Sequence, residues 1–287
     1  MPTVIVRMRE AMGVDAPVMD TPGPKGPLVS RRLTWMAPLV LLFLLLAVWA
    51  LASSSQGPMS FSLPSPGAVT KRSIVIMQES WFWSRVGLTL TESILGSFFG
   101  CVVALPTSWL IHKFRLINAA LQPFLGATQA IPAIALAPLL VLWVGYGLGG
   151  IVVLCALMVF FPILVSTTVG LRRLDPDVIE AASLDGASGF RLIFSIEVPL
   201  VLPSLLAGVR NGFTLSITGA VVGEMVMGGA GLGQLLVQQQ HNFDTAGMFV
   251  TVLFLCVLAM CLYSLVYFGE TKGRSALGLE RGRKKRS

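Results

Sequence analysis

Long uninterrupted runs of apolar residues dominate the chain. A helix needs about 20 mostly apolar residues to cross a hydrocarbon core roughly 30 Å thick. Six runs meet that requirement, and these are Leu33–Ala52, Leu88–Ile111, Ala119–Gly145, Ile151–Leu171, Leu202–Met227 and Met248–Phe268. They are too long for the core of a soluble domain. The pattern therefore predicts an all-α fold, a polytopic transmembrane helical bundle with six spans.

Prolines modify two parts of this pattern. Pro123 and Pro132 are expected to bend or split the start of the third span, because proline has no N–H and clashes with the preceding turn. Residues 53–80 form the one sizeable segment expected outside, and Pro58, Pro64 and Pro66 indicate that it begins in an extended conformation.

Composition supports a membrane protein and argues against a nucleic-acid partner. Only 12% of the 287 residues are charged, whereas soluble domains average about 25%. The net charge is +7, but no aromatic residues interleave the terminal basic runs and no nucleic-acid-binding module is visible. Contact with anionic membrane lipid explains these basic termini better.

The distribution of basic residues predicts the orientation. Six spans put both termini and the segments 112–118 and 172–201 on one side, and most of the 21 Lys and Arg residues fall there. The opposite side holds Lys71, Arg72 and Arg85, and Arg210 lies within the fifth run. The positive-inside rule then places both ends in the cytoplasm. Ala50-Leu51-Ala52 before serines also fits a cleaved signal peptide, although the apolar run is longer than a usual signal core.

Three regions follow from this pattern. Residues 1–32 carry proline, glycine and mixed charge without periodicity, which predicts a disordered cytoplasmic tail. Residues 33–268 form the transmembrane domain, and residues 269–287 form a basic cytoplasmic tail.

The most informative segment is the cytoplasmic loop 172–203. Asp175 followed by Pro176 is a helix start, with a capping oxygen and a ring already fixed at helical φ. Gly186 is expected to end this helix, and Ser188 to cap a second one that Pro199 stops. A plain connector needs only a few residues, so a folded helix–turn–helix here implies something to pack against.

An amphipathic hairpin on the membrane surface is the alternative interpretation of this loop. Two features argue against it. The acidic residues of the loop outnumber its basic ones, which suits an anionic leaflet poorly. Its small residues, Ala181, Ala182 and Gly186, suit close approach of another protein.

The same loop resembles a known family. Glu180-Ala181-Ala182, then Gly186, Ile196 and Pro199 at the expected spacing, resemble the EAA loop of ABC-importer permeases. The resemblance extends from about Phe61 to Phe268. Three further stretches resemble the nitrate, sulfonate and taurine branch: Leu63-Pro64-Ser65-Pro66, Ile131-Pro132 with Ala137-Pro138, and Gly231-Leu232-Gly233.

This resemblance implies a type I importer permease in a bacterial inner membrane. Two permease copies are expected to pair as a homodimer, and each EAA loop to dock on a separate ATP-binding cassette subunit. A periplasmic or lipid-anchored substrate-binding protein is expected to deliver the solute. The implied coupling residues are Glu180, Ala181, Ala182, Gly186, Ile196 and Pro199. Nitrate, a sulfonate such as taurine, and a thiamine-pathway pyrimidine are the implied substrate classes.

No chemistry is expected on this chain. A phosphate-binding loop needs a Gly-Lys pair, and the sequence contains none, so ATP and Mg²⁺ belong to the partner ATPase and no cofactor is expected here. His112 and His241 fall on opposite predicted sides, and Cys101, Cys155, Cys256 and Cys261 lie within apolar runs without CxxC spacing. Metal sites and disulfides are therefore not expected.

Ionisable residues at membrane depth suggest function, because burying them there is costly. Glu92, Arg210 and Glu224 are the candidates for the translocation path. We expect Glu224 to face the outer part of the cavity, and Arg210 to meet backbone carbonyls or a carboxylate further in. A structural ion pair or an interfacial position is the alternative. An ion-coupled secondary transporter or channel is the other functional class, and a membrane-embedded enzyme lacks the required side-chain clusters.

Overall fold

A computed structural model describes residues 31–54, 63–114, 116–121 and 132–276. These residues are almost entirely helical and contain no β-strand. Four helical stretches are long and apolar enough to cross a membrane: Ser80–Lys113, Leu148–Arg172, Gly189–Met227 and Thr245–Thr271. They correspond to the second, fourth, fifth and sixth predicted spans, and the all-α helical prediction is confirmed.

The first and third predicted spans need separate description. The first is the 24-residue helix α2 (Arg31–Ser54), whose side chains from Val40 onward are mostly exposed. The third begins with a short helix at 116–121 and ends in α6 (Ala133–Val144). Pro132 is the residue directly before α6, and Pro123, the other proline expected to bend or split the start of this span, lies outside the described residues.

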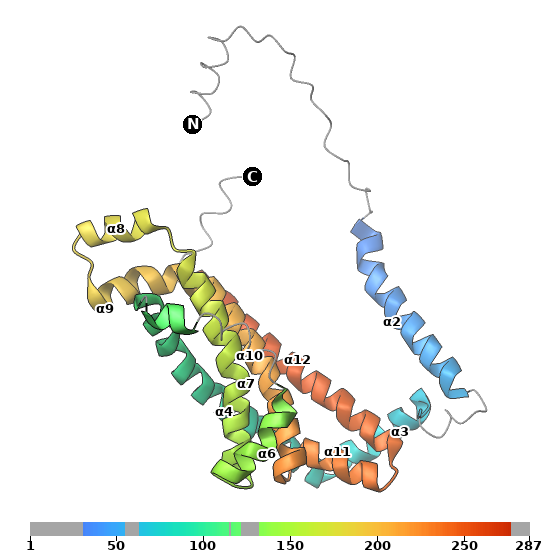
Figure 1. The fold of residues 1–287 in the computed structure, drawn as a ribbon. Coiled ribbons are helices and arrows are strands. Elements are labelled where there is room, and N and C mark those ends of the chain that lie inside the picture. Colours follow the sequence, from blue (N-terminus) through green and yellow to red (C-terminus); the bar gives the residue numbers. More distant parts are fainter. Residues whose placement is uncertain (1–30, 55–62, 115, 122–131, 277–287) are drawn as a thin grey trace. The chain divides into compact units, whose positions relative to one another are not determined.

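The helical bundle is built around three long helices. α7 (Leu148–Arg172) packs extensively against both α4 (Ser80–Lys113) and α10 (Val198–Met227). α12 (Thr245–Ala276) packs on α10, and α6 packs on α7 and α10. Figure 1 shows these helices running side by side.

Small residues allow the close approach of α4 and α7. A Cβ atom at Gly96 would overlap the β-carbon of Cys155, and one at Gly100 would lie 2.8 Å from the Ala156 carbonyl oxygen. Without a strong hydrophobic force between helices in lipid, such close packing is a main source of helix association. Gly96 and Gly100 therefore form a packing motif between α4 and α7.

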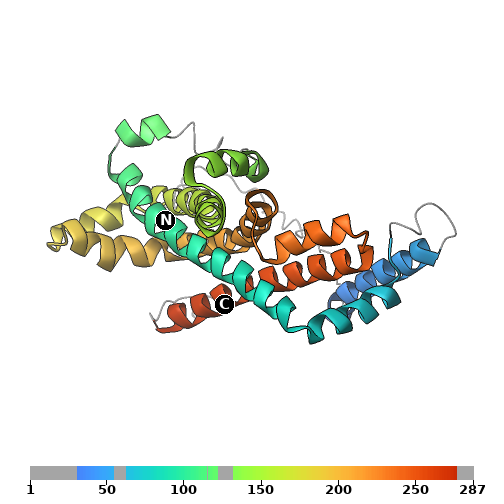
Figure 2. The ribbon, with the colours of Figure 1, turned by 90° about the horizontal axis from the view of Figure 1, so that it is seen from below.

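Shorter helices cover the two ends of this bundle. α8 (Pro176–Leu184) and α9 (Gly189–Leu192) lie at one end. At the other end, α11 (Leu232–His241) and α3 (Pro66–Gln78) both contact α12 (Figures 1 and 2). α3 and α11 were not predicted, because each is short and only weakly apolar.

The structure corrects the prediction that Pro199 stops the second helix of the loop. A π-helical turn, Ile193–Glu197, connects α9 directly to α10, and Pro199 lies in the first turn of α10. Proline is tolerated there because the first N–H groups of a helix have no intrahelical partner. The π-helical turn is wider than an α-helical turn, with the Val198 N–H donating to the Ile193 carbonyl five residues earlier. This turn accommodates the passage from α9 into α10.

Candidate functional site

The first helix of the loop forms for local reasons. The Asp175 carboxylate accepts a hydrogen bond of 3.0 Å from the Asp177 N–H, and Pro176 is the first helical residue. Asp177 adds negative charge in the first turn, where the helix dipole favours it. The predicted start of α8 is therefore confirmed.

Gly186 makes the turn that ends α8. Its φ is +85°, in the left-handed region where side chains with a Cβ are strained. The Ala187 N–H donates to the Ala182 carbonyl over 3.0 Å, and the Gly186 N–H donates to the Ser183 carbonyl over 3.1 Å. These two bonds close the end of the helix and reverse the chain into α9.

The resulting helical hairpin, residues 175–199, presents an unpartnered surface. No residue of α8 or α9 is buried. Several of its apolar side chains are exposed, notably Leu184, Phe190 and Phe194, and the rings of Phe190 and Phe194 stack 6.5 Å apart. Exposed apolar groups gathered at the end of a bundle are typical of a protein interaction site.

The implied coupling residues occupy distinct parts of this hairpin. Glu180 and Ala181 are exposed on α8, Ala182 is half-buried beside them, and Gly186 is exposed in the turn. Ile196 and Pro199 are half-buried on the return towards α10. The structure thus places all six on one continuous hairpin, and their coupling role stays a prediction.

One hydrogen bond anchors the hairpin to the bundle. The Trp109 indole N–H of α4 donates to a carboxylate oxygen of Glu197 over 2.7 Å, and Glu197 is buried. Glu197 belongs to the π-helical turn, so this bond ties the second, returning helical segment of the hairpin to α4. Sequence reasoning missed this pair because the two residues are 88 positions apart and neither belongs to a motif.

Arg210 lies against a carboxylate, which is one of the two kinds of partner expected for it, the other being backbone carbonyls. Its guanidinium is 3.6 Å from the Glu270 carboxylate of α12. Its central carbon also lies 5.1 Å from the centre of the Tyr263 ring and 5.6 Å from that of Tyr267. The cation is therefore neutralised and covered by two aromatic faces. A role of Arg210 in the translocation path stays a prediction.

Glu224 lies in an enclosed site near the other end of α10. It is fully buried and accepts hydrogen bonds from the Thr89 hydroxyl, over 2.6 Å, and from the Gly233 N–H. The same Thr89 oxygen accepts a bond of 2.9 Å from the Leu232 N–H. Glu92, also buried, is close enough to interact with Glu224.

Glycines allow this enclosure. A Cβ at Gly231 or Gly233 would run into the Glu224 carboxylate, so the backbone of this turn approaches the acid only because both residues lack a side chain. The resemblance to the transporter branch included residues 231–233 but gave no physical reason for the glycines there. The packing around Glu224 supplies that reason.

Whether Glu92 and Glu224 take part in transport stays a prediction.

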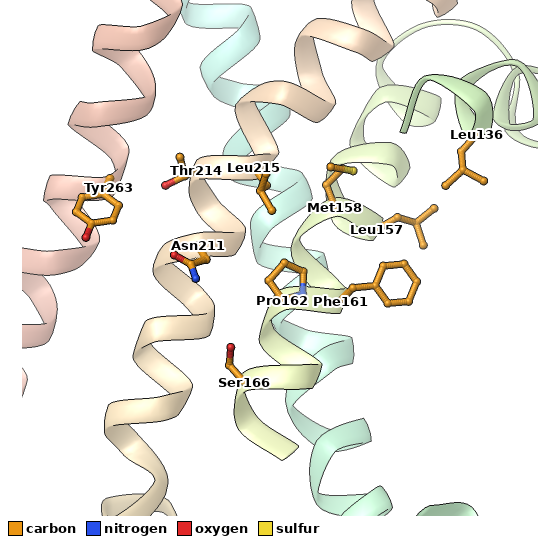
Figure 3. A pocket seen from close by; sticks show the side chains of 10 residues that line it. All are labelled: Leu136, Leu157, Met158, Phe161, Pro162, Ser166, Asn211, Thr214, Leu215 and Tyr263. Carbon is orange, nitrogen blue, oxygen red and sulfur yellow. The ribbon is translucent and has the colours of Figure 1, made fainter. Parts of the chain in front are cut away.

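A cavity of about 570 Å³ lies between α6, α7, α10 and α12 (Figure 3). Its apolar lining residues are Leu136, Leu157, Met158, Phe161, Pro162 and Leu215, and its polar ones are Ser166, Asn211, Thr214 and Tyr263. The described lining residues include no Asp, Glu, Lys or Arg. Glu92, Arg210 and Glu224 are not among them, although Tyr263 joins the cavity to Arg210.

A second, polar hollow of about 440 Å³ is lined by residues of α3, α4, α11 and the turn before α12. Figure 1 shows α3 and α11 at the end of the bundle opposite α8 and α9. Its lining includes Arg72, Arg85, Trp81 and Asp244. Arg72 pairs with Asp244 over 2.5 Å, and Arg85 donates to the Gln238 side chain over 3.0 Å. These bonds join α3 and α4 to α11 and to the turn before α12.

Long apolar helices, an exposed helical hairpin at one end and a cavity between the helices define an integral membrane transport protein. Residues 96–272 match the family described as the binding-protein-dependent transport system inner membrane component. The chain belongs to this family, which supplies the permease component of ABC importers alongside an ATPase and a substrate-binding protein.

Curated relatives span most of the chain. It is 39% identical to the riboflavin transport system permease protein RibX of Chloroflexus aurantiacus, over 79% of this chain and 84% of the relative. It is 32% identical to the formylaminopyrimidine transport permease protein ThiX of Halalkalibacterium halodurans, over 83% and 94% respectively. The putative aliphatic sulfonates permease SsuC of Escherichia coli is 28% identical, over 88% and 92%.

A solved structure supports the fold. A chain of the MetNI methionine ABC transporter, crystallised in inward-facing conformations, superposes with a TM-score of 0.58. The match covers 68% of this chain and 95% of that one at 23% identity. The predicted type I importer permease fold is therefore confirmed.

Proposed function

We propose that this chain forms the translocation path for a small organic solute and is driven by a separate ATPase that grips the 175–199 hairpin. The observation that carries this proposal is the hairpin itself. It has no buried residue in α8 or α9, exposes four large apolar side chains and continues without a break into α10. A force applied to it would act directly on a helix that lines the cavity.

Two contacts support this transmission. Trp109 ties the hairpin to α4, and at the end of α7, just before the hairpin, the Arg172 guanidinium donates to the side chain of Asn118 in the short helix 116–121. Movement of the hairpin would therefore displace α4 and α10 together rather than melt the loop. ATP and Mg²⁺ belong to the partner subunit in this proposal, and this chain carries out no reaction of its own.

The opposite end of the bundle is the proposed receiving side for a substrate-binding protein. Its hollow displays Arg72 and Arg85 beside Trp81, a combination of residues enriched at protein interfaces. In this proposal both termini and the hairpin lie on the cytoplasmic side of a bacterial inner membrane, and the distribution of basic residues along the sequence supports it.

The coupling role is tested with the partner ATPase co-expressed. Glu180→Lys reverses an exposed charge on α8 and is expected to weaken association with the ATPase at least about tenfold, which corresponds to roughly 1.4 kcal/mol. Glu79→Lys is the matched control, since Glu79 is also exposed but lies between α3 and α4. Co-purification and ATP-dependent uptake are measured for both variants.

Two results would contradict the coupling role. One is equal loss of ATPase in the Glu180→Lys and Glu79→Lys variants, which would indicate a general effect of charge reversal. The other is uptake at the wild-type rate after residues 177–189 are deleted, because no grip on the hairpin would then be needed.

A further inference from the structure

The cavity between α6, α7, α10 and α12 has the composition of a small-molecule site. Its volume of about 570 Å³ falls within the roughly 300–1,000 Å³ typical of such sites, which are mostly apolar with a few polar groups. The aromatic rings of Phe161 and Tyr263 and the side chains of Met158 and Leu215 supply apolar surface.

The polar groups of this cavity have unused hydrogen-bonding capacity. Within the described part of the chain, neither the Ser166 hydroxyl nor the Asn211 amide makes a hydrogen bond. Pro162 has no N–H, so the Met158 carbonyl four residues earlier lacks its usual intrahelical donor. The Ser166 and Asn211 side chains are therefore available to a ligand that carries both donors and acceptors.

The charge of the cavity distinguishes between ligand classes. Its described lining is uncharged, and Arg210, which stacks on the lining residue Tyr263, is already paired with Glu270 and also covered by Tyr267. A sulfonate or nitrate ion would therefore find no counter-charge among the described lining residues. An uncharged ring system needs no counter-charge and can pack against Phe161 and Tyr263.

We infer that this cavity binds an uncharged, planar nitrogen heterocycle during transport, with Asn211 and Ser166 reading its polar edge. The inference rests on the proposed function, because a solute site inside the bundle has a use only in a permease. It favours the flavin and pyrimidine chemistry named for RibX and ThiX over the anions named for SsuC. Arg210 is then a positioning residue that holds the Tyr263 ring.

The test uses the full-length permease with its ATPase in lipid nanodiscs, without the binding protein, so that any ligand signal belongs to the membrane complex. Riboflavin and a formylaminopyrimidine are the probes, and ethanesulfonate is the anionic competitor. We expect at least one heterocycle to bind saturably and ethanesulfonate not to displace it. Asn211→Leu, which removes the amide, is expected to weaken that binding about tenfold.

Thr214→Val and Thr107→Val form a matched pair. Both hydroxyls donate to the carbonyl four residues earlier, over 3.0 Å and 2.7 Å, but Thr107 lies on α4 and does not line the cavity. We expect the first variant to weaken binding about threefold and the second to leave it unchanged. Co-elution of the ATPase verifies that each variant is assembled.

Three results would overturn the inference: neither heterocycle binds, ethanesulfonate binds in their place, or the Asn211→Leu and Thr214→Val variants bind as the wild type does. The proposed function fails separately. If the Glu180→Lys variant loses the ATPase while the cavity variants have no effect, the permease role stands and only the ligand class is wrong.

Discussion

One side chain can supply hydrogen-bond partners to several buried polar groups of this bundle. Thr89 is the clearest case, because its hydroxyl accepts from the Leu232 N–H and donates to Glu224. The site joins α4, α10 and the start of α11 through one side chain. In an apolar interior each of these groups would be costly if left without a partner.

Thr89→Val tests this arrangement at constant shape. It leaves both the Leu232 N–H and one Glu224 oxygen without their partner, at an expected cost of about 2 kcal/mol in stability. A lower melting temperature of the purified protein in detergent measures it. Thr91→Val is the control, because the Thr91 hydroxyl is exposed and bonds only within its own helix; equal melting temperatures for the two variants would refute the assignment.

Trp109 makes the corresponding contact on the hairpin side. Trp109→Phe keeps an aromatic ring and removes the N–H that donates to Glu197. We expect amides of residues 193–198 to exchange hydrogen about tenfold faster, because a bond to a charged group stabilises by roughly 1.5–3 kcal/mol. Trp143→Phe, at an exposed position on α6, should not alter exchange there. Unchanged protection in the Trp109→Phe variant would remove the anchoring role.

Small residues let the helix backbones of this protein approach closely, and the resulting contacts hold the helices together. α4 and α7 approach at Gly96 and Gly100, and α10 approaches α7 through its own glycines, such as Gly212 beside Val159. Close contact maximises dispersion along the helix faces, and this is an important attraction available between apolar helices in lipid. The elements are therefore positioned by the smallest side chains in the sequence.

Gly100→Ala should separate α4 from α7. The new methyl group would lie 2.8 Å from the Ala156 carbonyl oxygen, so a backbone must shift; overpacking of this kind costs about 1–3 kcal/mol. The melting temperature is expected to fall, while Gly87→Ala, which has open space around it, should have a neutral or slightly stabilising effect. A stable Gly100→Ala protein would mean that this interface is looser than described.

At the scale of the whole molecule, the described part of the chain has the 175–199 hairpin at one end of the bundle and the polar hollow at the other. A cassette ATPase that works as a dimer presents two clefts, so one copy of this chain cannot fill both. We therefore expect two copies of the chain for every two ATPase subunits. Native mass spectrometry of the intact complex gives this stoichiometry directly. A complex with one copy of this chain and a different permease would contradict the homodimer.

The sequence predicted the elements whose signals are local. Apolar runs of sufficient length identified the second, fourth, fifth and sixth spans, and Asp175-Pro176 with Gly186 identified the start and end of α8. Each of these depends on neighbouring residues and on the cost of leaving backbone groups unsatisfied in lipid. The prediction failed at Pro199, because a π-helical turn lets the helix continue.

Only the tertiary structure decided which distant groups meet. The sequence contains no sign that Thr89 and the turn at Gly231–Gly233 enclose Glu224, that Trp109 holds Glu197, or that Glu270 neutralises Arg210. These pairs come from different helices, and their contact depends on how far each helix is rotated and shifted against its neighbours. The length and apolarity of a run specify that a helix forms, but the packing of small residues between helices specifies which of its faces is buried.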